Sequence, residues 1–297
     1  MERIITRFTV LAIFFTATIF FLMGSAPPDP VHKETKQLMN LVKEAAILVE
    51  QQEEAAFAEF HKKGSKWLHN DTYVFVIGLN GYVYVNPSRP ELEGHIQLGL
   101  KDLMGKAFIK SFVRETTAYA SRKEGWSHYV WFRPGEENPM WKTSYVKRVK
   151  APSGKEYIVG SGLYDMKMEK LFVVDMVEKA AELITKQGKQ AFAELKDPLG
   201  DFNYLTTYVF VLDSQGKDLV NPAFPGFEGQ NVRDLKDSTG KYFIRDMMKA
   251  LDSADSIWIE YMWPKPRQAA SSKKIAYVKK VVINREIYYV GSGAYLD

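Results

Sequence analysis

The chain has 297 residues, of which 46% are hydrophobic and 26% are charged, a balance typical of soluble proteins with packed cores. Its formal net charge is only +4 and no run of five like charges occurs, so a nucleic-acid partner is not predicted. There is no cysteine, which excludes disulfide bridges, thiolate catalysis and zinc–thiolate sites.

Residues 1–26 are predicted to be a signal peptide or an N-terminal anchor. Arg3 and Arg7 give a positive start, residues 8–23 are apolar apart from three threonines, and small residues at 24–26 offer a cleavage site. The apolar stretch is shorter than the ~20 residues that span a bilayer, which favours a cleaved signal over a retained anchor. Either alternative places the remainder in the periplasm or outside the cell.

Two long amphipathic helices are predicted, one over residues 38–60 and one over residues 173–195. In both segments apolar side chains recur at spacings of three and four residues. This stripe is typical of a helix that packs on a sheet. A role on a membrane or in a coiled coil is the weaker alternative.

A β-hairpin is predicted after each helix. In the first copy, residues 72–78 alternate between β-branched and aromatic side chains, and Asn80 and Gly81 suit the turn into a second strand at 83–85. In the second copy Gln215 and Gly216 occupy the same turn. The loop that follows, residues 86–99, is rich in Pro and Gly.

Three further strands and a short helix complete each copy. Residues 102–113 have a helical pattern, and Asp102, like Asp237 in the second copy, is expected to cap this helix. The remaining strands of the first copy are predicted at 126–132, 141–149 and 156–164 and form an antiparallel meander. The fold class is therefore α+β, with a long helix packed on a five-stranded antiparallel sheet.

The same series of elements occurs twice along the chain. Residues 72–110 align with residues 207–245 without a gap and share 19 of 39 positions. After a three-residue change of offset, residues 126–149 align with 258–281, and both copies close on a VGSG-x-Y motif. A period this long is about one domain. We expect two tandem modules, at 33–165 and 168–297.

The motifs shared by the copies carry a family resemblance. The set TYVFV, VNP, P-x-x-E-G, LKD, W-x-x-Y-x-W, K-x-x-Y-V-K and VGSG-x-Y resembles the Cache domain, specifically its small single-Cache type. The resemblance implies a PAS-like sensor fold outside the membrane that binds small metabolites, short organic acids in particular. It also implies signalling to kinases or chemotaxis proteins. No output domain follows the second copy, so we expect signalling through a partner, a membrane sensor kinase or chemoreceptor.

Strand parity predicts where a ligand binds. Tyr129 and Trp131 share one face of their strand, and Tyr145 and Lys147 share one face of the next, so pairing of these faces gathers hydroxyls, an indole and a cation. Such a set suits a small carboxylate. Because a register shift of one residue exchanges faces, Lys142 and Lys274 are the alternative cations. The predicted ligand-binding residues are Tyr129, Trp131, Tyr145, Lys147 and Asn86, with Tyr261, Trp263, Tyr277, Lys279 and Asn221 in the second copy, which is favoured as the working site.

Other motifs do not indicate catalysis or cofactors. The five histidines lack metal-ligand spacing, and no serine or threonine has a matched histidine and acid in both copies, so neither an enzyme nor a metal or cofactor is predicted. Gly160 and Gly162 lack the helix and lysine of a phosphate-binding loop, and we expect them to relieve crowding against the long helix.

The predicted function is an exported tandem-Cache sensor of a small carboxylate such as acetate, propionate, lactate or pyruvate. The alternative is an accessory module that binds no metabolite and uses its long helices to dock on a membrane receptor or to form a homodimer.

Overall fold

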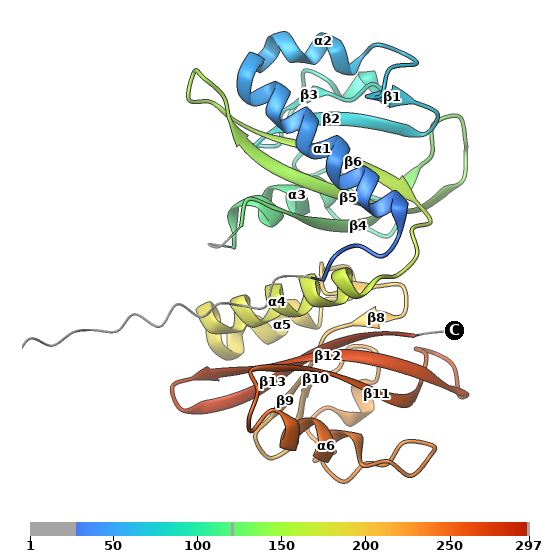
Figure 1. Ribbon diagram of the computed structural model, residues 1–297, viewed down its shortest axis with the longest axis vertical. Helices are drawn as coiled ribbons and strands as arrows, with labels where there is room; N and C mark the ends of the chain where they lie inside the picture. Colours follow the sequence, from blue (N-terminus) through green and yellow to red (C-terminus); the bar gives the residue numbers. More distant parts are fainter. Residues whose placement is uncertain (1–27, 120–121, 296–297) are drawn as a thin grey trace, which may run out of the picture.

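The computed structural model describes residues 28–119 and 122–295, which form two α+β modules joined by a short linker (Figure 1). The predicted leader at 1–26 lies outside these residues. Among the helices within the described ranges, none is both long and apolar enough to cross a membrane.

The first module begins with its long helix and ends with three long strands. Its elements are α1 (Lys33–Gln52), the 3-10 helix η1 (Glu53–Ala56), α2 (Phe57–Phe60), β1 (Leu68–His69), β2 (Thr72–Gly78), β3 (Val83–Val85), η2 (Pro90–Leu92), α3 (Phe108–Thr117), β4 (Glu124–Phe132), β5 (Pro139–Lys150) and β6 (Glu156–Tyr164).

The second module repeats this order. Its elements are α4 (Lys170–Gln187), η3 (Gly188–Gln190), α5 (Ala191–Leu195), β7 (Asn203–Tyr204), β8 (Thr207–Tyr208), β9 (Phe210–Asp213), β10 (Asp218–Val220), η4 (Pro225–Phe227), α6 (Phe243–Ala250), β11 (Ser256–Pro264), β12 (Ser271–Ile283) and β13 (Glu286–Tyr295).

Each module is a sheet with a helix on either face. The first sheet has the order β1-β2-β6-β5-β4, with β3 also paired to β2, and the second has the order β10-β9-β13-β12-β11. The long helix α1 packs on β5 and β6, and α3 packs against β4 on the opposite face. In the second module α4 and α6 take the corresponding places. The predicted α+β fold with a long helix on an antiparallel sheet is confirmed.

The long helices are interrupted where the apolar pattern predicts continuity. In the first module α1 stops at Gln52, and Glu53 has φ +50°, a left-handed conformation unusual for a side chain that is not glycine. The equivalent residue of the second module is Gly188, with φ +59°. The break turns the chain into η1 and α2, so the apolar stripe continues along a bent path.

The helix predicted from residue 102 begins only at Phe108, and Asp102 does not cap it. Instead, Asp102 Oδ1 accepts hydrogen bonds from the backbone N–H groups of Met104 and Lys106, and Oδ2 accepts one from Val130 of β4. Asp237 does the same in the second module, where Met262 of β11 is the strand donor. These aspartates therefore fasten the loop to the sheet.

The helix α4 lies between the modules and is buried on two sides (Figure 1). One side packs on its own sheet and the other contacts β4 of the first module. At the aligned position of α1 stands Gln37, whereas α4 has Phe172 there. The Phe172 ring lies 4.9 Å from that of Trp126 in the first module. The outer face of α4 is thus already covered.

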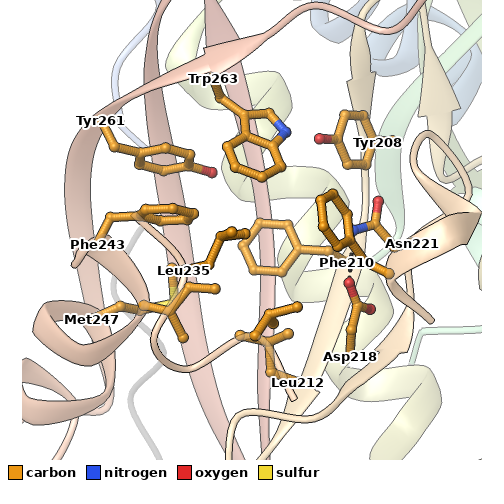
Figure 2. Close-up of a pocket in the computed structure, with 13 residues that line it drawn as sticks. Tyr208, Phe210, Leu212, Asp218, Asn221, Leu235, Phe243, Met247, Tyr261 and Trp263 are labelled. Atoms are coloured by element: carbon orange, nitrogen blue, oxygen red, sulfur yellow. Dashed lines mark hydrogen bonds between the residues drawn. The ribbon is translucent and has the colours of Figure 1, made fainter. Parts of the chain in front are cut away.

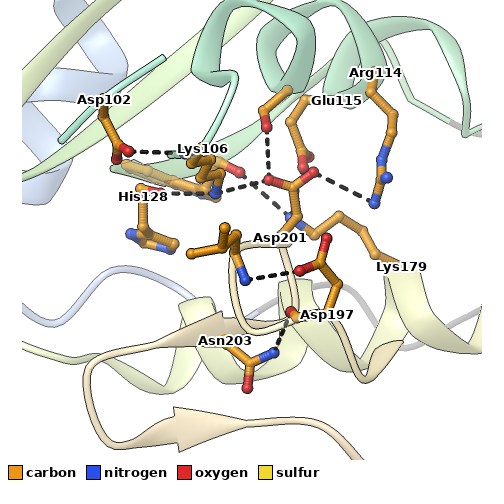
Figure 3. Close-up of polar contacts among 12 residues, drawn as sticks. Asp102, Lys106, Arg114, Glu115, His128, Lys179, Asp197, Asp201 and Asn203 are labelled. Atoms are coloured by element: carbon orange, nitrogen blue, oxygen red, sulfur yellow. Dashed lines mark hydrogen bonds and ion pairs between the residues drawn. The ribbon is translucent and has the colours of Figure 1, made fainter. Parts of the chain in front are cut away.

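Charged side chains are buried where the two modules meet (Figure 3). Asp201 pairs with Lys106 at 2.8 Å and with Arg114 at 3.3 Å. Beside it, Lys179 of α4 bridges Glu115 of α3 at 2.8 Å. Although burial opposes the charged form, Lys106 and Arg114 lower the pKa of the Asp201 carboxyl. The junction is held by ion pairs rather than by apolar packing alone.

Candidate functional site

The strand register decides which predicted site residues share a face. In the pairing of β4 with β5, Tyr129 lies opposite Lys142, whereas Tyr145 lies opposite Trp126. Because side chains alternate along a strand, Tyr145 and Lys147 point to the face opposite that of Tyr129. The predicted pairing of their faces is wrong, and the alternative lysine, Lys142, is the one that shares the face of Tyr129.

The face that Tyr145 and Lys147 share is covered by α1. The Tyr145 ring lies 4.8 Å from that of Trp126, in the cluster that packs under the helix. Lys147 forms an ion pair with Glu124 at 2.5 Å. Both side chains therefore lie on the helix face and not on the face that carries Tyr129.

The second module repeats this arrangement on its own helix face. Tyr277 donates a hydrogen bond to Glu178 of α4 at 3.1 Å, and Lys279 pairs with the same carboxylate at 2.5 Å. These two residues therefore tie β12 to α4 and do not reach the face that carries Tyr261.

The opposite face of the second sheet holds a cavity of about 40 Å³ (Figure 2). Three of the predicted residues, Tyr261, Trp263 and Asn221, line it, with β9, β10 and α6 supplying most of the rest. The lining residues are Tyr208, Phe210, Leu212, Asp218, Asn221, Phe227, Val232, Leu235, Phe243, Ile244, Met247, Tyr261 and Trp263.

Stacked aromatic rings form the wall of this cavity at β11 and α6. Tyr261 and Phe243 stack with ring centroids 4.3 Å apart and an interplanar angle of 10°. The Trp263 ring lies 5.3 Å from Phe243 and 5.6 Å from Phe224. In Figure 2 Tyr261, Trp263 and Tyr208 border one end of the cavity, and Asp218 lies toward the other. Such a wall suits a short apolar tail.

Lys274 lies directly behind the wall. It is the register partner of Tyr261, is fully buried, and its Nζ lies 4.1 Å from the centre of the Tyr208 ring and 5.3 Å from that of Tyr295. Its ammonium has no hydrogen-bond acceptor in the described part of the chain. Burial alone lowers the pKa of Lys274 to about 7.

The glycines of the VGSG motif make room for this lysine. A Cβ atom on Gly293 would lie 2.7 Å from Cε of Lys274, and one on Gly291 would lie 2.2 Å from the ring of Phe210. The crowding that these glycines relieve is therefore on the cavity face, not against the long helix as predicted. The intervening Ser292 donates to the Tyr208 carbonyl.

The loop after β10 is braced by Asn221 and Glu228, and Asn221 lines the cavity. Asn221 Oδ1 accepts a hydrogen bond from the Phe224 N–H at 3.2 Å, and Glu228 accepts one from the Asn221 N–H at 2.8 Å. The first module has the same pair, with Asn86 and Glu93. These residues shape the turn, as the P-x-x-E-G motif indicates.

The first module has the same construction around a smaller cavity of about 20 Å³. Asn86, Tyr129 and Trp131 line it, with Tyr73 in the place of Tyr208. The buried Lys142 has its Nζ 3.8 Å from the centre of the Tyr73 ring and, within the described residues, no acceptor. Burial lowers the pKa of Lys142, an effect that Tyr73 opposes.

Sequence reasoning missed two tyrosine positions of this site that both copies contain. Tyr208, Tyr295 and their counterparts Tyr73 and Tyr164 are identical in both copies and surround the lysines, but their strands were not assigned to the pocket. The signal was the pair of glycines preceding each terminal tyrosine. No group of metal-ligating side chains occurs among the residues that the structure describes.

Comparison with known proteins finds one family model and several similar solved structures. A family model described as Cache domain matches residues 31–297. One similar solved structure comes from a study of carboxylic acid recognition by a Cache chemosensory domain; it is 26% identical over 41% of this chain and 88% of its own, with a TM-score of 0.36. Another is a methyl-accepting chemotaxis protein from Vibrio parahaemolyticus, 26% identical over 41% of this chain and 82% of its own, with a TM-score of 0.35.

A third similar structure spans both modules. The ligand-binding domain of the Pseudomonas fluorescens chemoreceptor CtaA, in complex with L-serine, is 13% identical over 88% of each chain, with a TM-score of 0.29. The family match itself covers the chain from the start of α1 to its last residue. The chain thus belongs to the Cache domain family, a family of sensory ligand-binding domains.

Proposed function

We propose that the chain is an extracytoplasmic sensor protein that binds a small carboxylate of the acetate, propionate, lactate and pyruvate class. One observation carries the proposal. In each module a fully buried lysine ammonium, without an acceptor among the described residues, lies against a tyrosine that lines a cavity. A bound carboxylate is the partner that such a cation lacks.

The free-energy balance favours an anion in this place. A buried ammonium without a counter-ion loses several kcal/mol of hydration, and a contact with an aromatic ring returns roughly 2 kcal/mol. A carboxylate near Lys274 supplies a charge-assisted hydrogen bond, and tyrosine hydroxyls are suited to donate further ones. The apolar rings of Phe243 and Trp263 would enclose the tail.

A modest affinity is expected from the size of the ligand. The ceiling for very small ligands is about 1.5 kcal/mol per non-hydrogen atom, so acetate, with four, reaches about 6 kcal/mol. That value corresponds to a Kd of roughly tens of micromolar. An affinity in this range suits a sensor of changing nutrient concentrations.

The test is calorimetric titration and thermal unfolding of the full chain with the four acids. At millimolar ligand, binding of this strength stabilises the protein by roughly 2–3 kcal/mol. Lys274→Met should abolish binding at the second module and Lys142→Met at the first. Lys279→Met is the matched control, because it removes a cation from the same strand but from the helix face, and should leave binding intact.

The absence of any stabilisation by any of the acids, in wild-type protein near neutral pH, would contradict the sensor proposal. It would favour the accessory module that binds no metabolite. Binding that persists when Lys274→Met and Lys142→Met are combined in one chain would instead contradict the assignment of these lysines.

The signal is proposed to pass to a membrane sensor kinase or a chemoreceptor, with the chain in the periplasm or outside the cell. The outer face of α1 is the long-helix surface that remains for such a contact or for a homodimer, since α4 is covered by the first module. Cell fractionation, with the intact mass of the recovered protein, tests export and cleavage after Ala26. Recovery of full-length protein from the cytoplasm would contradict this location.

A further inference from the structure

The two cavities differ by one charged residue. Positions that line both cavities carry side chains of the same type in the two modules. Examples are Tyr73 with Tyr208 and Asn86 with Asn221. The exception is Val83 of the first module, which is replaced by Asp218 in the second. An apolar wall position has thus become a carboxyl group in the larger cavity.

Asp218 is buried without being fully paired. The residue is only 2% exposed, and its Oδ2 accepts a hydrogen bond from the Asn221 side-chain amide at 2.7 Å. Its Oδ1 receives no hydrogen bond from any described residue. Lys196, whose ammonium acts on the Asp218 carboxyl, is already paired with Glu228 at 2.6 Å. A buried acceptor of this kind destabilises the protein unless a donor reaches it.

The pKa of the Asp218 carboxyl is consistent with a buried group that lacks a cationic partner. Burial, assisted by the nearby Glu228 carboxylate, raises its pKa to about 6, and the Asn221 amide, the Lys196 ammonium and the Val220 N–H oppose the rise. At pH 7 and above the group is therefore mostly charged. A ligand ammonium would restore the interactions that the carboxylate has lost.

Resting on the proposed function, we propose that the second module binds an amino carboxylate, a molecule whose ammonium group pairs with Asp218 while its carboxylate is held at Lys274. The first module, with Val83, takes a carboxylate that has no amine. Asp218 is on β10 and Lys274 is on β12, with β9 and β13 between them. Three strand spacings of about 4.8 Å separate the backbones.

Tyr208 lies between the two charged groups. Burial chiefly raises the pKa of the Tyr208 hydroxyl and the Asp218 carboxylate adds to the rise, while the Lys274 ammonium lies over the Tyr208 ring. No hydrogen bond joins Asp218 and Lys274: Asp218 Oδ2 is bonded to Asn221, and neither Asp218 Oδ1 nor Lys274 Nζ has a hydrogen-bond partner among the described residues. Because the two groups stand on strands three spacings apart, an ω-amino acid, charged at opposite ends, fits them better than an α-amino acid.

The experiment compares each amino carboxylate with its parent acid in the full chain. Glycine, β-alanine, 4-aminobutyrate and 5-aminopentanoate are titrated at pH 7.5 beside acetate, propionate, butyrate and pentanoate. At least one ω-amino acid should bind the second module at least tenfold more tightly than its parent acid. Lys142→Met, which removes the first site, isolates the second.

Two substitutions test the role of Asp218. Asp218→Val, which copies the first module, and Asp218→Asn, which keeps the shape, should each weaken the ω-amino acid at least tenfold and leave or improve binding of its parent acid. The reciprocal Val83→Asp should give the first module affinity for the amine. Retention of folding by Asp218→Asn is checked by its unfolding transition.

The outcomes separate this inference from the proposed function. Binding of the plain acids with no gain from an amine, or equal losses for both ligand sets in Asp218→Asn, overturns the inference alone. If neither the plain acids nor the amino carboxylates bind the wild-type protein, both the proposed function and the inference are overturned.

Discussion

A fully buried lysine such as Lys274 costs the folded protein free energy whenever it carries its proton. Its pKa of about 7 lies below that of an unfolded chain, near 10.4, so the unfolded state binds more protons above neutrality. Wild-type stability should then rise with pH between 7 and 9, by about 1.4 kcal/mol per pH unit from this group.

Lys274→Met should remove that slope and stabilise the ligand-free protein at pH 7 by roughly 1–4 kcal/mol, because an apolar side chain of similar length replaces an uncompensated charge. Urea unfolding at pH 7, 8 and 9 measures both effects. A variant that is less stable than wild type at pH 7 would mean that Lys274 has a stabilising partner in the folded chain.

Ligand affinity should show the opposite dependence on pH. The proton that Lys274 lacks above pH 7 must be taken up when an anion binds, so the Kd should stay flat from pH 6 to 7 and weaken by up to about tenfold per unit above 7. Burial raises the pKa of the neighbouring Tyr208 and Tyr261, which stay neutral, and Asp218 titrates lower, near 6.

Calorimetry in two buffers with different ionisation enthalpies measures this proton uptake directly. Close to one proton per ligand is expected at pH 8.5, and almost none at pH 6. A Kd that is constant from pH 6 to 9 in wild-type protein would contradict a role for the lysine ammonium.

The choice between Lys142 and Lys147 shows why side-chain placement was only partly predictable. Tyr129, Trp131 and Asn86 line the cavity of the first module, and their segments alternate or lie in a recognisable turn. The central strand β5 is buried on both faces from Lys142 to Val146, so no polar–apolar alternation reveals its parity. Its two faces could be distinguished only by the register with β4.

At the scale of elements, the last strand of each module is shaped by its glycines. There is no space for a Cβ atom on Gly293. Such an atom would lie 2.7 Å from Cε of Lys274 and 2.7 Å from the Ile275 carbonyl oxygen. That oxygen is backbone and cannot rotate away. The strand can follow the lysine this closely only where it carries no side chain.

Gly293→Ala should therefore destabilise the second module by roughly 1–3 kcal/mol and weaken carboxylate binding by displacing Lys274. Gly226→Ala is the matched control, because nothing lies within 4 Å of the added Cβ, and it should change stability by no more than about 0.5 kcal/mol. Urea unfolding and titration with propionate provide the readouts. Equal effects of the two substitutions would contradict the packing argument.

The predicted elements differ from the structure mainly at their ends. Apolar spacing continues through Glu53, so the first copy carries no residue that indicates a break there. Gly188, at the equivalent position of the second copy, is a common helix terminator. The start of α3 at Phe108, later than predicted, is explained by the contacts of Asp102. Asp102 is a good capping residue by type, but its oxygens are used by a loop and by β4.

At the scale of the whole molecule, the repeat predicts two modules but not how they meet. The junction uses positions at which the copies differ, such as Asp175 and Lys179 in place of Asn40 and Glu44. A helix face that carries both apolar and charged residues is read as solvent-exposed in a single copy. Only the second module beside the first shows that these charges are buried.

The buried carboxylate of Asp201 is expected to couple the stabilities of the modules. Asp201→Asn leaves Lys106 and Arg114 without their shared counter-ion, and the loss of one partner from a buried ion pair typically costs 3–5 kcal/mol. The exposed pair of Glu59 with Lys62 gives the control, since Glu59→Gln should cost less than about 1 kcal/mol.

Urea unfolding followed by tryptophan fluorescence separates the modules, because the second contributes only Trp258 and Trp263. The wild-type protein should unfold in a single transition. Asp201→Asn should unfold in two, because the weakened junction lets the less stable module unfold before the other. The same variant should leave the ligand affinity of the second module unchanged, because Asp201 does not line its cavity. A single, unshifted transition in Asp201→Asn would mean that apolar contacts of α4, and not the buried charges, hold the modules together.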